Sequence, residues 1–225
     1  MDVGGRITFR DLSRKETAPA VELLARGMRD NPILVRTFGA DPEKRQRRLS
    51  RYYAQVVPFT QPRGGFLGAF AGGTLVGVIG ALQPGCCRPR LLEVLRFVPS
   101  LLANNTPAAA LRVKRWQDAW TRNDPQEDHW HVGLVAVDAD VQGMGVGTGL
   151  MSEHCARMDR LGTTSYLETD KAINVRFYQK FGYRIVGQEP VLGVANWFMK
   201  RLAKAEGEHQ SPLAARDMPI PARRD

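Results

Sequence analysis

The chain has 225 residues, of which 43% are hydrophobic and 24% are charged. These values are ordinary for a globular protein and argue against disordered, collagen-like and fibrous classes. Three cysteines are too few, and odd in number, for a disulfide framework, and no Cys-x-x-Cys motif or His/Cys cluster has zinc spacing. We therefore expect a reduced, cytoplasmic protein without a bound metal ion.

Basic residues outnumber acidic residues by 32 to 23, which gives a formal net charge of +9. Such an excess suits an anionic partner, either nucleic acid, a membrane surface or a phosphorylated cofactor, but dispersed charge that keeps a protein in solution explains it equally well. No helix-turn-helix, zinc finger or RNA-binding strand signature accompanies the charge, so we expect no nucleic-acid partner.

One uncharged segment, residues 64–87, is long enough to cross a bilayer. It holds eight glycines, and Gly72-Gly73 divides it into two apolar runs, which is typical of a two-stranded hairpin with a two-residue turn. The first five residues also lack the basic and apolar regions of a secretion signal. We expect neither membrane insertion nor export.

Periodicity and capping signals predict the other elements in chain order. A strand at 6–12 precedes a helix that follows the capping box Ser13-x-x-Glu16 and stops at Asn31-Pro32, and a basic helix begins at Asp41-Pro42 and runs towards residue 57. Beyond the hairpin (66–71 and 74–82) we expect two helices in an insert (91–102 and from 107), a strand (129–138), a glycine loop leading into a helix that ends near 161, a strand (164–169), a helix (172–181) and two strands (183–188 and 194–200). This order predicts one mixed α/β or α+β domain over residues 1–205, with a flexible polar tail at 206–225.

The most informative stretch is the glycine-rich run from Gln142 to Gly149, which lies between a predicted strand and a predicted helix. Glycines let a ligand approach the main chain closely, and the start of a helix offers unpaired N–H groups and a positive dipole end. The run is therefore a candidate pyrophosphate site. No lysine follows the glycines, as a Walker loop requires, and no register matches the Gly-x-Gly-x-x-Gly dinucleotide fingerprint.

The pattern Gln142-x-x-Gly145-x-Gly147 resembles the acyl-CoA signature of the GCN5-related N-acetyltransferase (GNAT) superfamily. The later Tyr166-Leu-Glu-Thr169 strand, Asn174 and the stretch Phe177–Tyr183 resemble the second half of the same family. The insert before the central strand and the closing Trp197-x-Met-x-Arg201 look most like the subgroup that contains puromycin N-acetyltransferase. The resemblance implies a mixed, mostly antiparallel sheet of about seven strands flanked by helices, with a two-helix insert before the central strand.

The resemblance also implies which residues hold the cosubstrate, acetyl-CoA. The main-chain N–H groups of the glycine loop would bind the pyrophosphate, the backbone of the central strand would pair with the pantetheine arm, and Asn174 would bond the other side of that arm. Tyr178, also next to the cofactor, would be the general acid that protonates the departing thiolate, although its spacing alone fits a core aromatic residue. The implied cofactor-binding residues are Val135, Ala136, Val137, Gln142, Gly143, Met144, Gly145, Val146, Gly147, Thr148, Asn174 and Tyr178.

The general base is open between two side chains. An alkyl amine is mostly protonated at neutral pH, so a carboxylate, an imidazole or a water chain must take its proton. Glu168 is the first candidate and His131 the second, although either could have a purely structural role. Cys155 falls at core spacing in a helix and is no candidate nucleophile, so we expect direct attack of the amine on the thioester.

Three functions therefore compete. The first is acetylation of a primary amine of a small molecule, the second is acetylation of a protein lysine or N-terminus, and the third is non-catalytic sensing of acyl-CoA. Insert helices that close over the site would favour a small acceptor, whereas an open groove would favour a protein. We expect a monomer or a homodimer.

Overall fold

The computed structural model describes residues 7–87 and 106–204. Its centre is a seven-stranded sheet in which every neighbouring pair is antiparallel except β4 and β5, which are parallel. The predicted mixed, mostly antiparallel architecture is thereby confirmed. In spatial order the strands are β1 (Ile7–Asp11), β2 (Phe66–Ala71), β3 (Thr74–Leu82), β4 (His129–Val137), β5 (Thr164–Thr169), β7 (Val194–Arg201) and β6 (Arg184–Val191).

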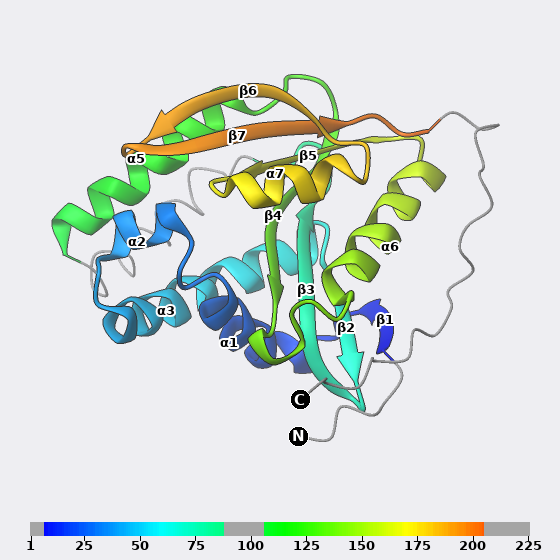
Figure 1. Cartoon of the computed structure of the whole chain (residues 1–225), viewed down its shortest axis with the longest axis horizontal. Helices are drawn as coiled ribbons and strands as arrows, with labels where there is room; N and C mark the ends of the chain where they lie inside the picture. The colour runs from blue at the N-terminus through cyan, green and yellow to red at the C-terminus, as the bar shows by residue number, and fades with distance from the viewer. Residues whose placement is uncertain (1–6, 88–105, 205–225) are drawn as a thin grey trace.

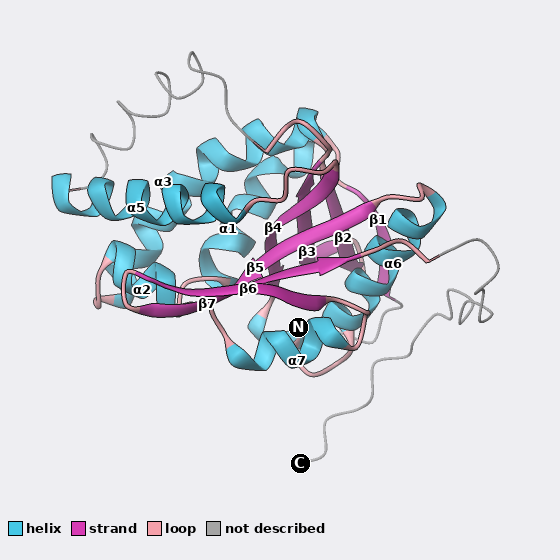
Figure 2. Cartoon of the chain, turned by 90° about the horizontal axis from the view of Figure 1, so that it is seen from above, coloured by secondary structure: helices cyan, strands magenta, loops and turns pink. Residues whose placement is uncertain are grey.

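Helices cover both faces of the sheet, and each face has its own hydrophobic core. Figure 2 shows α1, α3 and α5 on one side of the strands and α7 on the other. The first core joins α1, α2, α3 and α5 to the sheet, and the second joins α6 and α7 to it. The helices are α1 (Thr17–Gly27), α2 (Pro32–Phe38), α3 (Pro42–Thr60), α5 (Pro107–Asn123), α6 (Val146–Arg160) and α7 (Ala172–Gln179).

Local hydrogen bonds and backbone conformations account for the starts of two helices and for one turn. The side chain of Asp41 accepts a hydrogen bond from the N–H of Lys44 at the start of α3, and Thr106 caps α5 in the same way, with proline at the first helical position of both. Gly72 and Gly73, with φ of 53° and 83°, form the turn between β2 and β3. These features confirm the predicted hairpin and the predicted starts of two helices.

The helix α2 was not predicted. Asn31-Pro32 indicates only the end of the first helix, but Pro32 is also the first residue of α2. A proline fits this position because its missing N–H needs no intrahelical acceptor there. The predicted insert helix at 91–102 and the predicted tail at 206–225 lie outside the described residues.

The sheet splits between β4 and β5. These strands pair only from His129 with Thr164 to Val132 with Leu167, and a bulge falls at Gly133, which is skipped in the pairing with β3. Beyond that point β5 pairs with β7 alone, and Figure 1 shows β4 and β7 running in different directions. In the described part of the chain, no strand pairs with the edge of β4 that faces the split, from Gly133 to Val137.

None of the helices in the two described segments combines the length and the apolar character that crossing a membrane requires. The uncharged segment at 64–87 contains β2 and β3, as the hairpin prediction required.

Candidate active site

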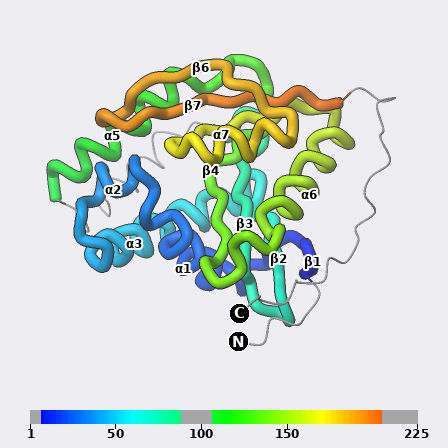
Figure 3. The backbone as a smooth tube through the Cα atoms, in the orientation of Figure 1, coloured from blue at the N-terminus to red at the C-terminus, as the bar shows by residue number. Residues whose placement is uncertain are grey.

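The glycine loop places free main-chain donors at the start of α6. Gly143 and Gly145 adopt φ of 79° and 83°, a left-handed conformation that favours glycine, and Gly145 is the N-cap of the helix. The N–H groups of Val146, Gly147 and Thr148 lie in the first turn, where a helix provides no acceptor, and no described residue accepts from them. Figure 3 follows the chain from β4 through this loop into α6. Free N–H groups at a helix start are the kind of donors that bind phosphate groups.

Glycine at 147 is not demanded by the packing of the protein itself. A Cβ atom there would lie 3.6 Å from a methyl group of Val137 and 3.8 Å from the ring of Phe177, which are ordinary van der Waals distances. Its φ is not in the left-handed region either. The absence of a side chain therefore keeps space open above the N–H groups, as the approach of a ligand would require.

The loop is fixed to the end of β4. The side chain of Gln142 donates from Nε2 to the carbonyl oxygen of Val137, at 3.1 Å. Asp138, the next residue, forms an ion pair with Arg26 on α1, at 2.9 Å. Val135, Ala136 and Val137 thus present their backbone to the split immediately before the glycine loop.

Tyr178 and Asn174 lie one turn apart on α7, on the same side of the sheet as α6. Tyr178 is 5% exposed, and its ring contacts those of Phe177 and Tyr183. Its hydroxyl group forms no hydrogen bond with any residue in the described segments. Burial, aided by the negative charge of Asp170, raises the pKa of Tyr178, so the phenol is neutral at physiological pH.

Glu168 and His131 meet on the opposite side of the sheet. His131 Nε2 and Glu168 Oε2 are 2.8 Å apart, and the Glu168 side chain is fully buried. The other carboxylate oxygen, Oε1, is buried without a hydrogen-bond partner among the described residues. Burial lowers the pKa of His131, but the carboxylates of Glu168 and Asp124, together with the Cys87 thiol, outweigh it and hold that pKa well above its usual range. The two candidate bases are therefore one hydrogen-bonded pair.

Three further side chains surround this pair, and the sequence analysis did not single them out. Asp124 Oδ1 lies 3.1 Å from His129 Nε2 and 3.4 Å from His131 Nδ1, and Cys87 Sγ lies 3.7 Å from His129 Nε2. The available signal was the alternation His129-Trp-His131, because side chains two residues apart on a strand share one face. Asp124 lies only five residues before His129, but Cys87 comes from a distant part of the chain, and no local pattern could have placed it there.

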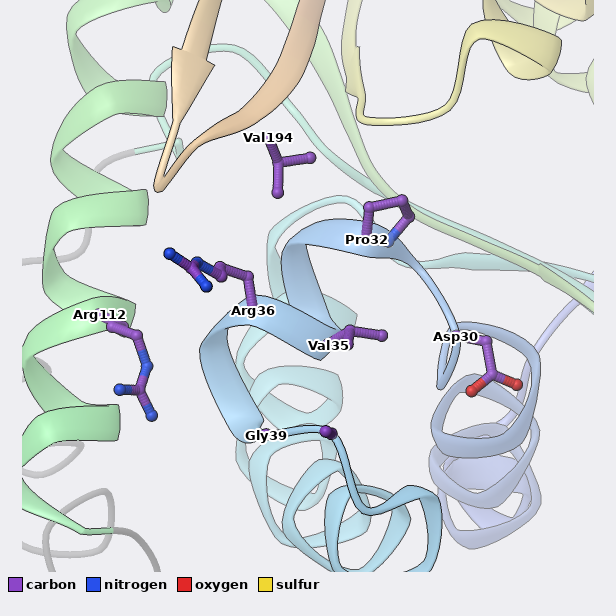
Figure 4. A pocket seen from close by; sticks show the side chains of 8 residues that line it. Asp30, Pro32, Val35, Arg36, Gly39, Arg112 and Val194 are labelled. Atoms are coloured by element: carbon purple, nitrogen blue, oxygen red, sulfur yellow. The ribbon is translucent and has the colours of Figure 1, made fainter.

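A cavity of about 600 Å³ opens on the face covered by α2 and α5. Figure 4 shows Arg36 on α2 and Arg112 on α5 at its walls, with Val194 at the start of β7 and Asp30 before α2. Each arginine uses Nε to donate to a carbonyl oxygen, that of Leu192 for Arg36 and that of Thr37 for Arg112.

Cys155 is a buried residue of α6 and faces the core. Burial raises its pKa to about 11, which fits the expectation that it is no nucleophile.

Several solved structures of similar fold are described as acetyltransferases. The chain is similar to a histone acetyltransferase HPA2 and related acetyltransferase from Corynebacterium glutamicum, with a TM-score of 0.69 and 20% identity over 89% of this chain and 98% of that chain. It is similar to a polyamine N-acetyltransferase from Drosophila melanogaster, with a TM-score of 0.60 and 16% identity over 87% and 99% of the two chains. It is also similar to the PaiA N-acetyltransferase from Thermoplasma acidophilum in complex with coenzyme A, with a TM-score of 0.53 and 15% identity over 87% and 98%.

The model of the acetyltransferase (GNAT) family matches residues 31–183, a span that includes the split, the glycine loop, α7 and the Glu168–His131 pair. The match confirms the family that the glycine pattern predicted, and with it the cosubstrate, acetyl-CoA. The chain belongs to the GNAT family of acetyl-CoA-dependent N-acetyltransferases.

Proposed function

We propose that this enzyme transfers an acetyl group from acetyl-CoA to a primary amine of a small molecule, by direct attack within a ternary complex. The observation that carries the proposal is the split between β4 and β5. It has a phosphate-binding loop at its mouth, a neutral phenol on one face and a buried carboxylate–imidazole pair on the other. A thioester in the split would lie between an acid and a base.

The cofactor would be held mainly by the main chain. The N–H groups of the loop, from Gln142 to Thr148, would bind the pyrophosphate. The free edge of β4 at Val135, Ala136 and Val137 would pair with the pantetheine arm as an added strand does. Asn174, half-buried on α7 and without a side-chain partner among the described residues, would bond the arm from the other side.

Tyr178 would supply the proton that the leaving sulfur needs. When the amine nitrogen bonds to the carbonyl carbon and the C–S bond breaks, the electron pair goes to sulfur. A thiol has a pKa of about 8.5, whereas that of Tyr178 lies above the ordinary value of about 10. The phenol is thus protonated and available at neutral pH, and the unbonded hydroxyl of Tyr178 is free to face the sulfur.

Glu168 would take the proton from the attacking amine. Its Oε1 atom is buried and unpaired, while Oε2 is held by His131, so one oxygen is positioned and the other is available. His131 is then a positioning residue, and the proton leaves to solvent after the reaction. We therefore propose Glu168, rather than His131, as the general base.

A small acceptor is favoured by the size of the cavity on the face that Glu168 occupies. That cavity of about 600 Å³ is lined by residues of α2, by Arg112 on α5 and by Val194 at the start of β7, and its volume is in the range that small ligands fill. The name of the polyamine N-acetyltransferase of similar fold, which refers to a small amine, also supports the proposal. The finer assignment to the puromycin N-acetyltransferase subgroup stays a prediction.

The test is a thiol-release assay with acetyl-CoA and a panel of acceptors. The panel contains polyamines, arylalkylamines, aminonucleosides and lysine or N-terminal peptides. We expect turnover with one class of small amine and none with peptides. Turnover restricted to peptides would replace the small acceptor by a protein. Tight CoA binding without turnover on any acceptor would favour an acyl-CoA sensor.

A further inference from the structure

Four side chains with metal-binding atoms meet beside the candidate base. They are Cys87, just beyond β3, Asp124, just beyond α5, and His129 and His131, both on β4. The sulfur of Cys87, a carboxylate oxygen of Asp124 and one ring nitrogen of each histidine all lie within 4.8 Å of one another. No side chain of this cluster except His131 has a part in the proposed acetyl transfer.

The spacing of these atoms matches a tetrahedral zinc site. With zinc–nitrogen and zinc–oxygen bonds of roughly 2.0–2.1 Å and a zinc–sulfur bond of roughly 2.3 Å, neighbouring ligand atoms are separated by roughly 3.3–3.6 Å. The cluster shows 3.1 Å and 3.4 Å from Asp124 Oδ1 to the two ring nitrogens, and 3.7 Å from Cys87 Sγ to His129 Nε2. These three of the six separations are close to the tetrahedral values, and all six are at most 4.8 Å, so closing the site around an ion requires the side chains to move together by about 1 Å at most.

Hydrogen bonds on the far side of each imidazole orient its inner nitrogen. His129 Nδ1 lies 2.8 Å from the carbonyl oxygen of Glu127, which can only accept, so this nitrogen carries the ring proton. His131 Nε2 lies 2.8 Å from the carboxylate of Glu168, which fixes its proton in the same way. In the neutral form of both rings the remaining lone pairs, at His129 Nε2 and His131 Nδ1, therefore face the carboxylate of Asp124. Outer partners of this kind accompany metal-binding histidines in general.

These convergent acceptors need a positive charge between them. Two imidazole lone pairs, a carboxylate and a thiolate repel one another in a half-buried space unless a cation or protons separate them. The Nδ1 atom of His131 is buried and forms no hydrogen bond with a described residue, although it lies 3.4 Å from Asp124. A dication balances the two negative charges of Cys87 and Asp124 and leaves the site neutral.

We propose that Cys87, Asp124, His129 and His131 bind one divalent cation of the zinc class. The mixed thiolate, imidazole and carboxylate donor set suits Zn²⁺ better than Mg²⁺ or Ca²⁺, which prefer oxygen ligands alone. Four protein ligands close the coordination sphere, so the ion is structural and offers no position to substrate. It fastens the chain beyond β3 and the chain beyond α5 to β4, and it fixes the ring of His131 against Glu168.

The sequence predicts no metal ion because the four ligands do not form a local motif along the chain. Asp124, His129 and His131 lie close together, but Cys87 is separated from them by the whole of α5 and the residues before it. Only the pairing of β3 with β4, which places Leu82 opposite His131, brings the end of β3 near the histidines.

The test uses the full reduced chain, stripped of metal with a chelator and titrated with Co²⁺ and then Zn²⁺. We expect one equivalent of Co²⁺ to give the d–d bands of a tetrahedral complex and a thiolate-to-cobalt charge-transfer band, and one equivalent of Zn²⁺ to abolish both. Cys87→Ser should remove the charge-transfer band, whereas the matched Cys86→Ser, one residue away, should retain it. Binding that is equal in the two variants would overturn the proposal.

A second measurement does not depend on any variant being folded. Thiol alkylation of the wild-type chain, followed by peptide mass spectrometry, should show that Zn²⁺ protects Cys87 at least tenfold and leaves the rate at Cys86 unchanged. Absence of the cobalt bands, or equal alkylation of Cys87 with and without Zn²⁺, would show that the cluster is a metal-free hydrogen-bond network. Neither readout involves acetyl transfer, so the outcome is independent of the proposed function.

Discussion

The two faces of the sheet contribute to the site in different ways. The face covered by α6 and α7 offers mainly main-chain groups, which are the N–H groups at the start of α6 and the free edge of β4. The face covered by α1, α3 and α5 offers side chains, with Glu168 and His131 at the centre and Asp124, His129 and Cys87 around them. A backbone site requires glycines at fixed spacing, whereas a side-chain site can be assembled from any distant segments. The first kind can be recognised in a sequence and the second is visible only once the chain is folded.

We call the face covered by α1, α3 and α5 the side-chain face, and the face covered by α6 and α7 the backbone face. The strongest test of the side-chain face is Glu168→Gln. Glutamine keeps the shape of the side chain and its contact with His131 but cannot take a proton from the amine. We expect turnover to fall roughly 1000-fold, in the middle of the range for general acid–base groups. The KM for acetyl-CoA should not change, because we propose that the cofactor is held by the loop before α6 and the edge of β4 rather than by Glu168.

The matched control is Glu189→Gln on β6, where the side chain is partly exposed and forms an ion pair with Arg122. This control should keep wild-type turnover. A Glu168→Gln enzyme that is equally active would remove Glu168 from the mechanism and leave the proton to water.

The backbone face is tested by Gly147→Glu. A side chain here fits the protein, and an acidic residue in the first turn of a helix is favourable for folding, so the variant should fold. Its charge would oppose the pyrophosphate, and we expect the affinity for CoA to fall roughly 300-fold, or about 3.4 kcal/mol, in calorimetric titration.

Ser152→Glu places the same charge on the exposed side of α6, away from the free N–H groups. Its affinity for CoA should stay within about twofold of wild type, equivalent to roughly 0.4 kcal/mol. Equal affinities in the two variants would mean that the start of α6 is not the phosphate site.

Tyr178→Phe removes the one side-chain proton donor that we assign to the backbone face. Turnover should fall roughly 100-fold while the affinity for CoA is retained, because only the leaving sulfur loses a partner. Tyr183→Phe is the contrasting variant, since its hydroxyl is bonded to Ser165 Oγ at 2.7 Å in the core. It should lower the free energy of unfolding by about 1 kcal/mol and leave turnover unchanged. Wild-type turnover in Tyr178→Phe would make that residue a core aromatic only.

The smallest expected effect is a decrease in the free energy of unfolding at acidic pH, caused by His154 on the backbone face. His154 on α6 is buried beside Ser165, and burial, with the charges of Arg201 and Arg157, lowers its pKa from 6.5 to about 4. Because the unfolded chain binds this proton first, stability is complete above pH 6.5 and falls as the pH decreases towards 4. At pH 5 the loss is about 2 kcal/mol.

Chemical denaturation of the wild type and of His154→Gln at pH 7.5 and pH 5 measures the contribution of His154 to the free energy of unfolding. The variant should lose about 2 kcal/mol less than the wild type over that interval. An equal loss in both proteins would place the acid sensitivity elsewhere.

The same contrast explains what the sequence could predict. The glycine loop, the hairpin turn at Gly72-Gly73 and the capped start of α3 depend on local conformational demands, and all three were predicted. The helix α2 was missed because a proline can both end one helix and begin the next. Tyr178 was predicted from the family resemblance and Glu168 from its place on the strand that follows the helix after the glycine loop, since spacing alone did not separate a catalytic role from a structural one for either residue. The contact between Glu168 and His131 depends on the register of β4 with β5, which no local pattern encodes.

The most direct test follows backbone amide exchange by mass spectrometry, with and without CoA. In the free protein the N–H groups of Val146, Gly147 and Thr148 have no acceptor and should exchange rapidly. We predict that saturating CoA slows exchange in peptides that cover the start of α6 and the free edge of β4 at 135–137. CoA binding that leaves these amides unprotected, or that protects a different part of the molecule, would contradict the assignment of the cofactor to the split.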